Sequence, residues 1–199
     1  FYMSGVIMWN YFAACLNATA TTFVTNASIF GKVYFPRLIM PLSVVISNLL
    51  KFLIQFAFFL IIIIYYLIQG DTTIQLTWYI LFTPLLVLLM AILGLSIGLI
   101  ISSMTTKYRD LVHLVAFGVQ LMMYATPVVY SSSIVEGKLR TLLFLNPMTG
   151  IIEGFRYAFL GTGTFDFHML AYSFIVTIVL FIIAIITFNR VEKVFMDTV

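Results

Sequence analysis

Charged residues and cysteines are scarce in this sequence. Of its 199 residues only 9% are charged, whereas a soluble domain carries about 25%. Such a chain cannot cover a water-facing surface, which excludes a soluble domain. Its single cysteine, Cys15, excludes an internal disulfide and a cysteine-based metal cluster, and we expect this side chain to be small, buried and apolar. A net charge of +3 is too small to indicate nucleic-acid binding.

Long apolar runs are what the sequence does have. Hydrophobic residues make up 63% of the chain, and its mean hydropathy is +1.14. A helix needs about 20 apolar residues to cross a bilayer. Five segments approach or exceed this length: Tyr2–Val24, Leu42–Ile68, Trp78–Ser103, Leu111–Tyr130 and Met169–Phe188. The sequence therefore predicts an all-α integral membrane protein, with five transmembrane helices in one domain that spans residues 1–199.

The first of these segments is the least apolar, because it contains two asparagines and several threonines. Helical spacing places Asn10, Ala14, Asn17 and Thr21 on one face. The opposite face carries bulky residues, namely Met8, Phe12, Leu16 and Phe23. We expect the small and polar face to contact neighbouring helices, and the bulky face to contact lipid or a second packed helix.

Basic residues mark one side of the membrane. They follow the first, third and fifth segments: Lys32 and Arg37, Lys107 and Arg109, and Arg190 and Lys193. The short connection "QGDTTIQLT" between the second and third segments has none. The positive-inside rule then places the basic loops and the C-terminus in the cytoplasm. Five spans leave the N-terminus outside, so we expect a first span upstream of Phe1, with six spans in the intact protein.

Residues 131–166, between the last two segments, hold two apolar stretches that are too short to cross a membrane. These are Leu139–Leu145 and Ile151–Leu160, and "NPM" at Asn146–Met148 separates them. One interpretation is a re-entrant helical pair on the outer side; another is an amphipathic hairpin on the membrane surface. Glu153 and Arg156 stand three positions apart and can pair on one helical face.

Several residues within the spans allow more than one interpretation. Lys51 is either functional or extends its long side chain to the cytoplasmic interface. Small residues at Gly94, Gly98 and Ser102 favour close helix packing over ligand binding. We expect Pro84 and Pro127 to kink their helices.

Two tyrosines flank Pro127 near the outer end of the fourth segment. Tyr124 and Tyr130 form either part of an interfacial aromatic belt or a row of aromatic faces along which sugars slide.

Catalytic and nucleotide-binding motifs are missing from the sequence. It contains no P-loop, no H-E-x-x-H pattern, no Ser-His-Asp order and no carboxylate pair. His113 and His168 are far apart in the sequence and are predicted to lie on opposite sides of the membrane, which disfavours a shared metal site. We predict no catalytic residue, no metal site and no cofactor on this chain.

Five stretches in the same order resemble the permease subunit of polysaccharide-exporting ABC transporters. They are "KVYFPRLIMPLS" (Lys32–Ser43), "YRDLVHLV" (Tyr108–Val115), "QLMMYATPVVY" (Gln120–Tyr130), "LNPMTGIIEGFRYAFLG" (Leu145–Gly161) and "FNRVEKVFMD" (Phe188–Asp197). Such permeases move O-antigen, capsule or teichoic-acid chains. The resemblance implies six spans, a leading amphipathic helix and a re-entrant pair, of which this sequence lacks the leading helix and the first span.

The resemblance also implies partners and a location. Two permease copies form the pore in the bacterial cytoplasmic membrane, and two separate ATPase subunits bind ATP and Mg on its inner face. The substrate is a polysaccharide or a lipid-linked glycan.

By the same resemblance, site residues fall into three groups. The ATPase-coupling loop holds Lys32, Tyr34, Phe35, Pro36 and Arg37; the second cytoplasmic turn holds Tyr108, Arg109 and Asp110; the translocation path and outer gate hold Tyr124, Tyr130, Asn146, Pro147, Glu153 and Arg156.

Two alternatives remain open at this point. A related ABC permease exports a drug or a lipid with the same architecture. A polytopic membrane enzyme is the other, but it requires ionisable residues clustered at one membrane depth, and the sequence shows no such cluster.

Overall fold

The computed structural model describes residues 1–26, 38–70, 75–105, 108, 110–135, 137–163 and 166–196, and within these residues it contains helices and no β-strand. The longer helices are α1 (Tyr2–Ala20), α4 (Ile39–Ile68), α5 (Thr83–Thr105), α6 (Leu111–Ala125), α8 (Pro147–Leu160) and α9 (Phe167–Met196). The shorter elements are α2 (Thr22–Thr25), η1 (Trp78–Phe82), η2 (Ser132–Ile134) and α7 (Lys138–Leu145). The all-α prediction is confirmed for the described residues.

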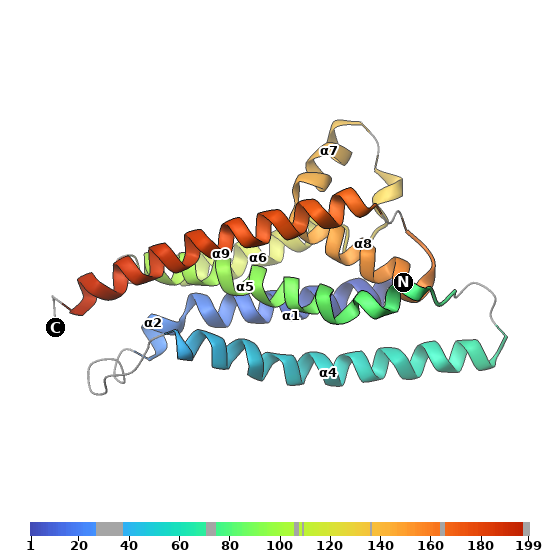
Figure 1. The fold of residues 1–199 in the computed structure, drawn as a ribbon, viewed down its shortest axis with the longest axis horizontal. Coiled ribbons are helices and arrows are strands. Elements are labelled where there is room, and N and C mark those ends of the chain that lie inside the picture. Colours follow the sequence, from blue (N-terminus) through green and yellow to red (C-terminus); the bar gives the residue numbers. More distant parts are fainter. Residues whose placement is uncertain are drawn as a thin grey trace.

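The long helices run roughly side by side, and the two ends of the bundle differ (Figure 1). One end carries the N-terminus, α7 and α8, and we call it the α8 end. The opposite end carries α2 and the C-terminal end of α9, and we call it the α2 end. Helix α5 is central: 61% of the residues in the most apolar stretch of Trp78–Thr105 are buried, against 17% in α4 and 22% in Phe167–Val191. Helices α4 and α9 therefore have few fully buried residues in these stretches.

Among the described residues, three helical segments are long and apolar enough to cross a membrane: Ile39–Ile68, Trp78–Thr105 and Phe167–Val191. Helix α6 is apolar but has only 15 residues and ends at Ala125, five residues before the predicted end at Tyr130. The reason is local, because Thr126 precedes a proline and takes an extended conformation. Pro127 thus lies beyond the helix and does not kink it, which corrects the sequence prediction.

Pro84 also has a different place from the one expected. It is the second residue of α5 and follows the 3₁₀ turn η1, so the predicted segment Trp78–Ser103 consists of two helical elements. A proline is tolerated in the first turn of a helix, because its missing N–H would have no partner there.

Helices α1 and α5 pack closely through glycine. A Cβ atom added at Gly98 would lie 2.6 Å from Cβ of Thr19 and 3.0 Å from the carbonyl oxygen of Leu16. At Gly94 it would lie 3.1 Å from Cβ of Cys15. The prediction that Gly94 and Gly98 serve close helix packing is confirmed.

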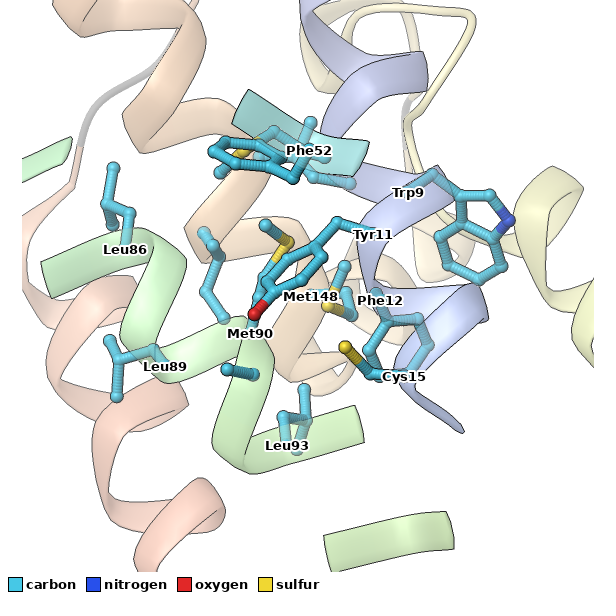
Figure 2. Close-up of a cluster of buried hydrophobic side chains, with 14 of the residues drawn as sticks. Trp9, Tyr11, Phe12, Cys15, Phe52, Leu86, Leu89, Met90, Leu93 and Met148 are labelled. Carbon is cyan, nitrogen blue, oxygen red and sulfur yellow. The ribbon is translucent and has the colours of Figure 1, made fainter. Parts of the chain in front are cut away.

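The bulky face of α1 lies in the core of the bundle (Figure 2). Met8, Phe12 and Leu16 are each at most 2% exposed, and they pack with residues of α4, α5 and α8. Cys15 is fully buried, as predicted. The polar face, in contrast, is the more open one: Asn10 is exposed and Asn17 is half-buried.

The two short apolar stretches after α6 form a helical pair, α7 and α8, that meets at Asn146. Helix α8 begins at Pro147, four residues earlier than the predicted stretch Ile151–Leu160. Asn146 accounts for this start, because its side chain accepts a hydrogen bond from the N–H of Met148 at 3.0 Å and so caps the helix.

Carbonyl groups at the C-terminal end of α8 accept hydrogen bonds from a segment that is distant in the sequence. The N–H groups of Gln75 and Thr77 donate to the carbonyl oxygens of Leu160 (3.4 Å) and Ala158 (3.1 Å), and the Thr77 hydroxyl donates to that of Tyr157 at 2.7 Å. The carbonyl groups of Ala158 and Leu160 thereby gain partners that the helix end itself does not supply, while that of Tyr157 also accepts from the N–H of Gly161.

Candidate functional site

A pocket at the α8 end gathers four of the residues that the sequence assigns to a translocation path. It has a volume of about 610 Å³ and lies between the end of α6, the segment that follows, α7 and the start of α8. Its lining consists of Met122, Tyr124, Ala125, Tyr130, Val135, Leu139, Leu142, Leu143, Leu145, Asn146 and Pro147. We call it the outer pocket.

Two tyrosines and an asparagine give the outer pocket its polar groups. Tyr124 is 74% exposed, so its ring is available to a ligand. The hydroxyl of Tyr130 donates to the main-chain carbonyl of Tyr124 at 3.2 Å, which ties the two residues together across Pro127. The apolar remainder of the lining offers surface but no charge.

Asn146 connects the pocket to both helices beside it. Its side-chain N–H group donates to the hydroxyl of Thr126 at 2.8 Å, while its side-chain oxygen caps α8. The Thr126 hydroxyl in turn donates to the carbonyl of Met122 at 2.7 Å. The start of α8 is thereby fastened to the end of α6.

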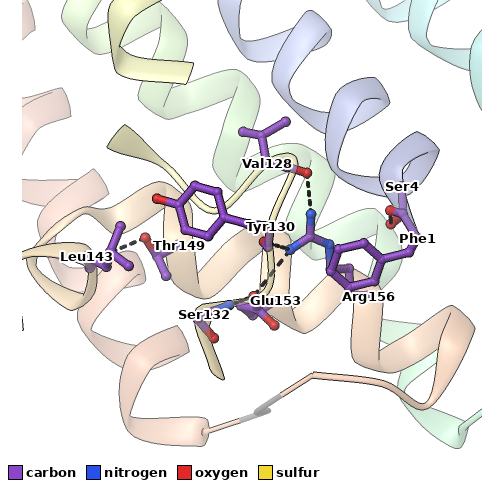
Figure 3. Close-up of polar contacts among 9 residues, drawn as sticks. All are labelled: Phe1, Ser4, Val128, Tyr130, Ser132, Leu143, Thr149, Glu153 and Arg156. Carbon is purple, nitrogen blue, oxygen red and sulfur yellow. Dashed lines mark hydrogen bonds and ion pairs between the residues drawn. The ribbon is translucent and has the colours of Figure 1, made fainter. Parts of the chain in front are cut away.

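A buried cation holds the segment between α6 and α7 (Figure 3). Arg156, fully buried in α8, donates to the carbonyl oxygens of Val128 and Tyr130, the latter at 3.0 Å. It also forms an ion pair with Glu153 at 3.3 Å, and its guanidinium lies 4.1 Å from the centre of the Phe1 ring. The pairing of Glu153 with Arg156 on one helical face is confirmed.

Glu153 completes this cluster from the same helix. It is 1% exposed, and its Oε1 atom also accepts a hydrogen bond from the N–H of Ser132 at 3.2 Å. Glu153 and Arg156 therefore do not line the outer pocket: they lie inside the protein and bind the backbone of Val128, Tyr130 and Ser132, of which Tyr130 lines the pocket. Their geometry gives them a positioning role.

Close approach of α1 to this cluster depends on a glycine. A Cβ atom added at Gly5 would lie 2.6 Å from a terminal nitrogen of Arg156 and would also collide with the carbonyl oxygen of Val128. The buried cluster thus joins α1, α8 and the segment after α6.

Comparison with known proteins places the chain in a family. A family model of ABC-2 type transporters matches residues 1–160, which is most of the chain. The chain belongs to the ABC-2 type transporter family. It is thus a multi-pass membrane protein, in agreement with the three long apolar segments.

Named relatives of this ABC-2 protein support a narrower comparison. Two proteins of Klebsiella pneumoniae, each named O-antigen export system permease protein RfbA, are 28% identical to it over 193 residues, 96% of this chain and 72% of theirs. A protein of the same name from Myxococcus xanthus is 28% identical over 161 residues, 80% of this chain and 60% of its own length.

The residues predicted to contact an ATPase are only partly covered by the structure. Lys32, Tyr34, Phe35, Pro36 and Arg37 lie outside the described residues, as does Arg109. Tyr108 is 55% exposed, and Asp110 is exposed at the start of α6. The assignment of Tyr108, Arg109 and Asp110 to the second cytoplasmic turn therefore stays a prediction.

Sequence patterns missed two parts of the site in this ABC-2 protein. One is Thr126, whose fully buried hydroxyl links α6 to Asn146; its position before Pro127 was the available signal, because pre-proline residues end helices. The other is Gln120, which faces a second cavity together with residues of α1. An amide within an otherwise apolar helix was the signal there. In the described part of the chain, no three potential metal ligands lie together.

Proposed function

We propose that this chain is the membrane-spanning subunit of an ATP-driven exporter that moves a lipid-linked polysaccharide or a teichoic-acid-type polymer across the bacterial cytoplasmic membrane. The observation that carries this proposal is similarity along 96% of the chain to two proteins named O-antigen export permeases. The outer pocket supports it, because exposed aromatic rings such as that of Tyr124 suit the apolar faces of sugars.

Partners follow from the same proposal. Two copies of the permease form the pore, and two ATPase subunits supply the energy with ATP and Mg bound to them. Lys32, Tyr34, Phe35, Pro36 and Arg37 form the coupling loop, and Tyr108, Arg109 and Asp110 form the second contact. Both regions adjoin helix ends at the α2 end of the bundle: α2 and α4 flank the first, and α5 and α6 flank the second (Figure 1).

The membrane orientation is part of this proposal. The basic residues of the sequence place the α2 end and the C-terminus in the cytoplasm, so the α8 end faces outward. Five spans then cross the bilayer, and α7 and α8 form the re-entrant pair. The bonds from residues 75–77 to the end of α8 support this, because backbone at membrane depth needs internal partners.

In this arrangement Tyr124, Tyr130, Asn146 and Pro147 line the outer gate, and Glu153 with Arg156 holds its backbone in place. Opening of this gate would break the hydrogen bonds of Asn146 and Arg156, because they connect α8 to Thr126, at the end of α6, and to the segment that follows.

A second candidate, export of a drug or lipid, is favoured by one observation. A cavity of about 660 Å³ lies among α1, α4, α5, η1 and α8, and its lining is almost wholly apolar, with residues such as Phe52, Leu60 and Phe159. An apolar cavity suits an acyl chain or an apolar drug better than a glycan.

The deciding experiment deletes the gene for the full-length protein in its source organism and compares surface polysaccharide with drug and lipid phenotypes. We expect surface polymer to disappear and lipid-linked polymer to accumulate in the cytoplasm, with both restored by the gene. Unchanged surface polymer together with altered drug sensitivity or lipid distribution would support the second candidate.

A further inference from the structure

A second groove, between α1 and α6, carries polar groups at the depth of the apolar helices. Its volume is about 480 Å³, and we call it the amide groove. Helix α1 contributes Trp9, Asn10, Ala13 and Asn17, and helix α6 contributes Ala116, Val119, Gln120, Met123 and Tyr124. Three side-chain amides, those of Asn10, Asn17 and Gln120, thus face one groove.

None of these three side-chain amides makes a hydrogen bond to any residue in the described part of the chain. Asn10 and Gln120 are exposed, and Asn17 is half-buried. The indole N–H of Trp9 has no such bond either, and Figure 2 shows its nitrogen pointing away from the buried cluster. Hydrocarbon offers a lipid-facing amide no partner, and an unpaired polar group there costs several kcal/mol. The groove therefore requires a polar occupant.

The charge and spacing of the lining restrict that occupant. The groove has no ionisable group other than the Tyr124 phenol, so it offers no cation to pair with a phosphate or a carboxylate. Amides both donate and accept, which matches hydroxyl groups. Asn10 and Asn17 are about 10 Å apart along the helix axis, so an extended chain of hydroxyl-bearing rings can contact both.

The amide groove adjoins the outer pocket. Tyr124 lines both cavities, with Gln120 one helical turn before it on α6. The two cavities therefore adjoin at the side chain of Tyr124.

We propose that the amide groove is a binding subsite for the hydroxyl groups of a carbohydrate chain, with Asn10, Asn17 and Gln120 as its hydrogen-bonding residues. This inference rests on the proposed function and names the residues that contact the polymer within the membrane. Hydrogen bonds to neutral amides are individually weak. Weak contacts suit a transport path, because the cargo must be able to leave each site that it occupies.

The test uses the full-length permease with its ATPase in cells that lack the native gene. The triple variant Asn10→Leu/Asn17→Leu/Gln120→Leu removes the amides and keeps side chains of similar size. We expect polymer export to fall about tenfold (~1.4 kcal/mol), while co-purification with the ATPase is retained. Gln55→Leu on α4, which makes the same change outside the groove, should leave export unchanged.

A photo-cross-linking amino acid at position 120 identifies the occupant directly. A cross-link to polymer supports the inference, and a cross-link only to a second copy or another protein segment overturns it. Wild-type export by the triple variant also overturns it, provided the unmodified protein exports polymer. If the unmodified protein exports none, the proposed function fails instead.

Discussion

The side-chain N–H group of Asn146 donates a hydrogen bond to the hydroxyl of Thr126 at 2.8 Å, across 20 positions of sequence. This bond joins the start of α8 to the end of α6, and the same asparagine caps α8 through its oxygen. One side chain thus both caps α8 and links it to the end of α6, and substitutions can separate the two effects on stability.

Asn146→Ala removes both hydrogen bonds, whereas Asn146→Asp keeps an acceptor at the start of α8 and loses only the donor to Thr126. A lost cap costs about 1 kcal/mol, so we expect the alanine variant to have the lower Tm of the two in detergent. Equal Tm values for the two variants would contradict a capping role.

Arg156→Met is expected to destabilise the protein strongly. Removing one partner of a buried ion pair typically costs about 3–5 kcal/mol, because the other charge stays buried without compensation. The double variant Glu153→Leu/Arg156→Met should recover part of this loss, but not all, since the carbonyls of Val128 and Tyr130 also lose their donor. Denaturant unfolding of the purified variants measures both effects; losses that simply add would argue against the pair.

Gly98→Ala tests the close contact of α1 with α5. The added methyl group meets Thr19 and the backbone of Leu16, so the helices must separate, at a cost of about 1–3 kcal/mol. Gly118→Ala on α6 is the matched control, because no atom lies within 4 Å of its added Cβ. We expect a lower Tm for the first variant only. A similar Tm for both would mean that α1 and α5 do not pack as described.

Tyr124→Ala should lower polymer export, while Tyr124→Phe should keep it near the wild-type level, because sugar contact uses the ring face. Tyr66→Ala, which removes an exposed tyrosine on α4 away from the outer pocket, serves as the control. The assay is surface polysaccharide in cells. If the alanine variants at 66 and 124 behave alike, Tyr124 belongs to an interfacial aromatic belt.

Lys32→Glu/Arg37→Glu should weaken binding of the ATPase and leave membrane insertion intact, because the loop loses the cations available to acidic groups. The matched control is Lys138→Glu/Arg140→Glu, the same reversal on α7 at the opposite end of the bundle. Co-purification with the ATPase is the measurement. Normal recovery of the ATPase with the first variant would rule out the coupling assignment.

The local pattern of the sequence was sufficient to predict most helices. Apolar length gave α4, α5 and α9, and "NPM" gave the division between α7 and α8. Both are short-range effects: burial in a bilayer needs a run of apolar residues, and a proline sets the start of a helix. The errors concerned the ends of helices. Helix α6 ends at Ala125, although the apolar run continues to Tyr130, because the next residue precedes a proline and disfavours helical geometry.

The direction in which each helix face points could not be predicted in the same way. The bulky residues of α1 were assigned to lipid or to another helix, and only the packing against α4, α5 and α8 places them in the core. In a membrane both lipid and protein are apolar, so a hydrophobic face does not by itself indicate its neighbour.

By itself, then, the sequence determined that this protein is a helical membrane protein, that a turn at Asn146–Met148 separates α7 from α8, and that Glu153 and Arg156 share a helical face. Composition, proline and helical period fix these features, because they act over a few residues. The tertiary structure alone decided that this pair turns inward onto the backbone of residues 128–132, and that Asn10, Asn17 and Gln120 meet in one groove. These relationships join residues 20 or more positions apart, and only the packing of one helix against another fixes them.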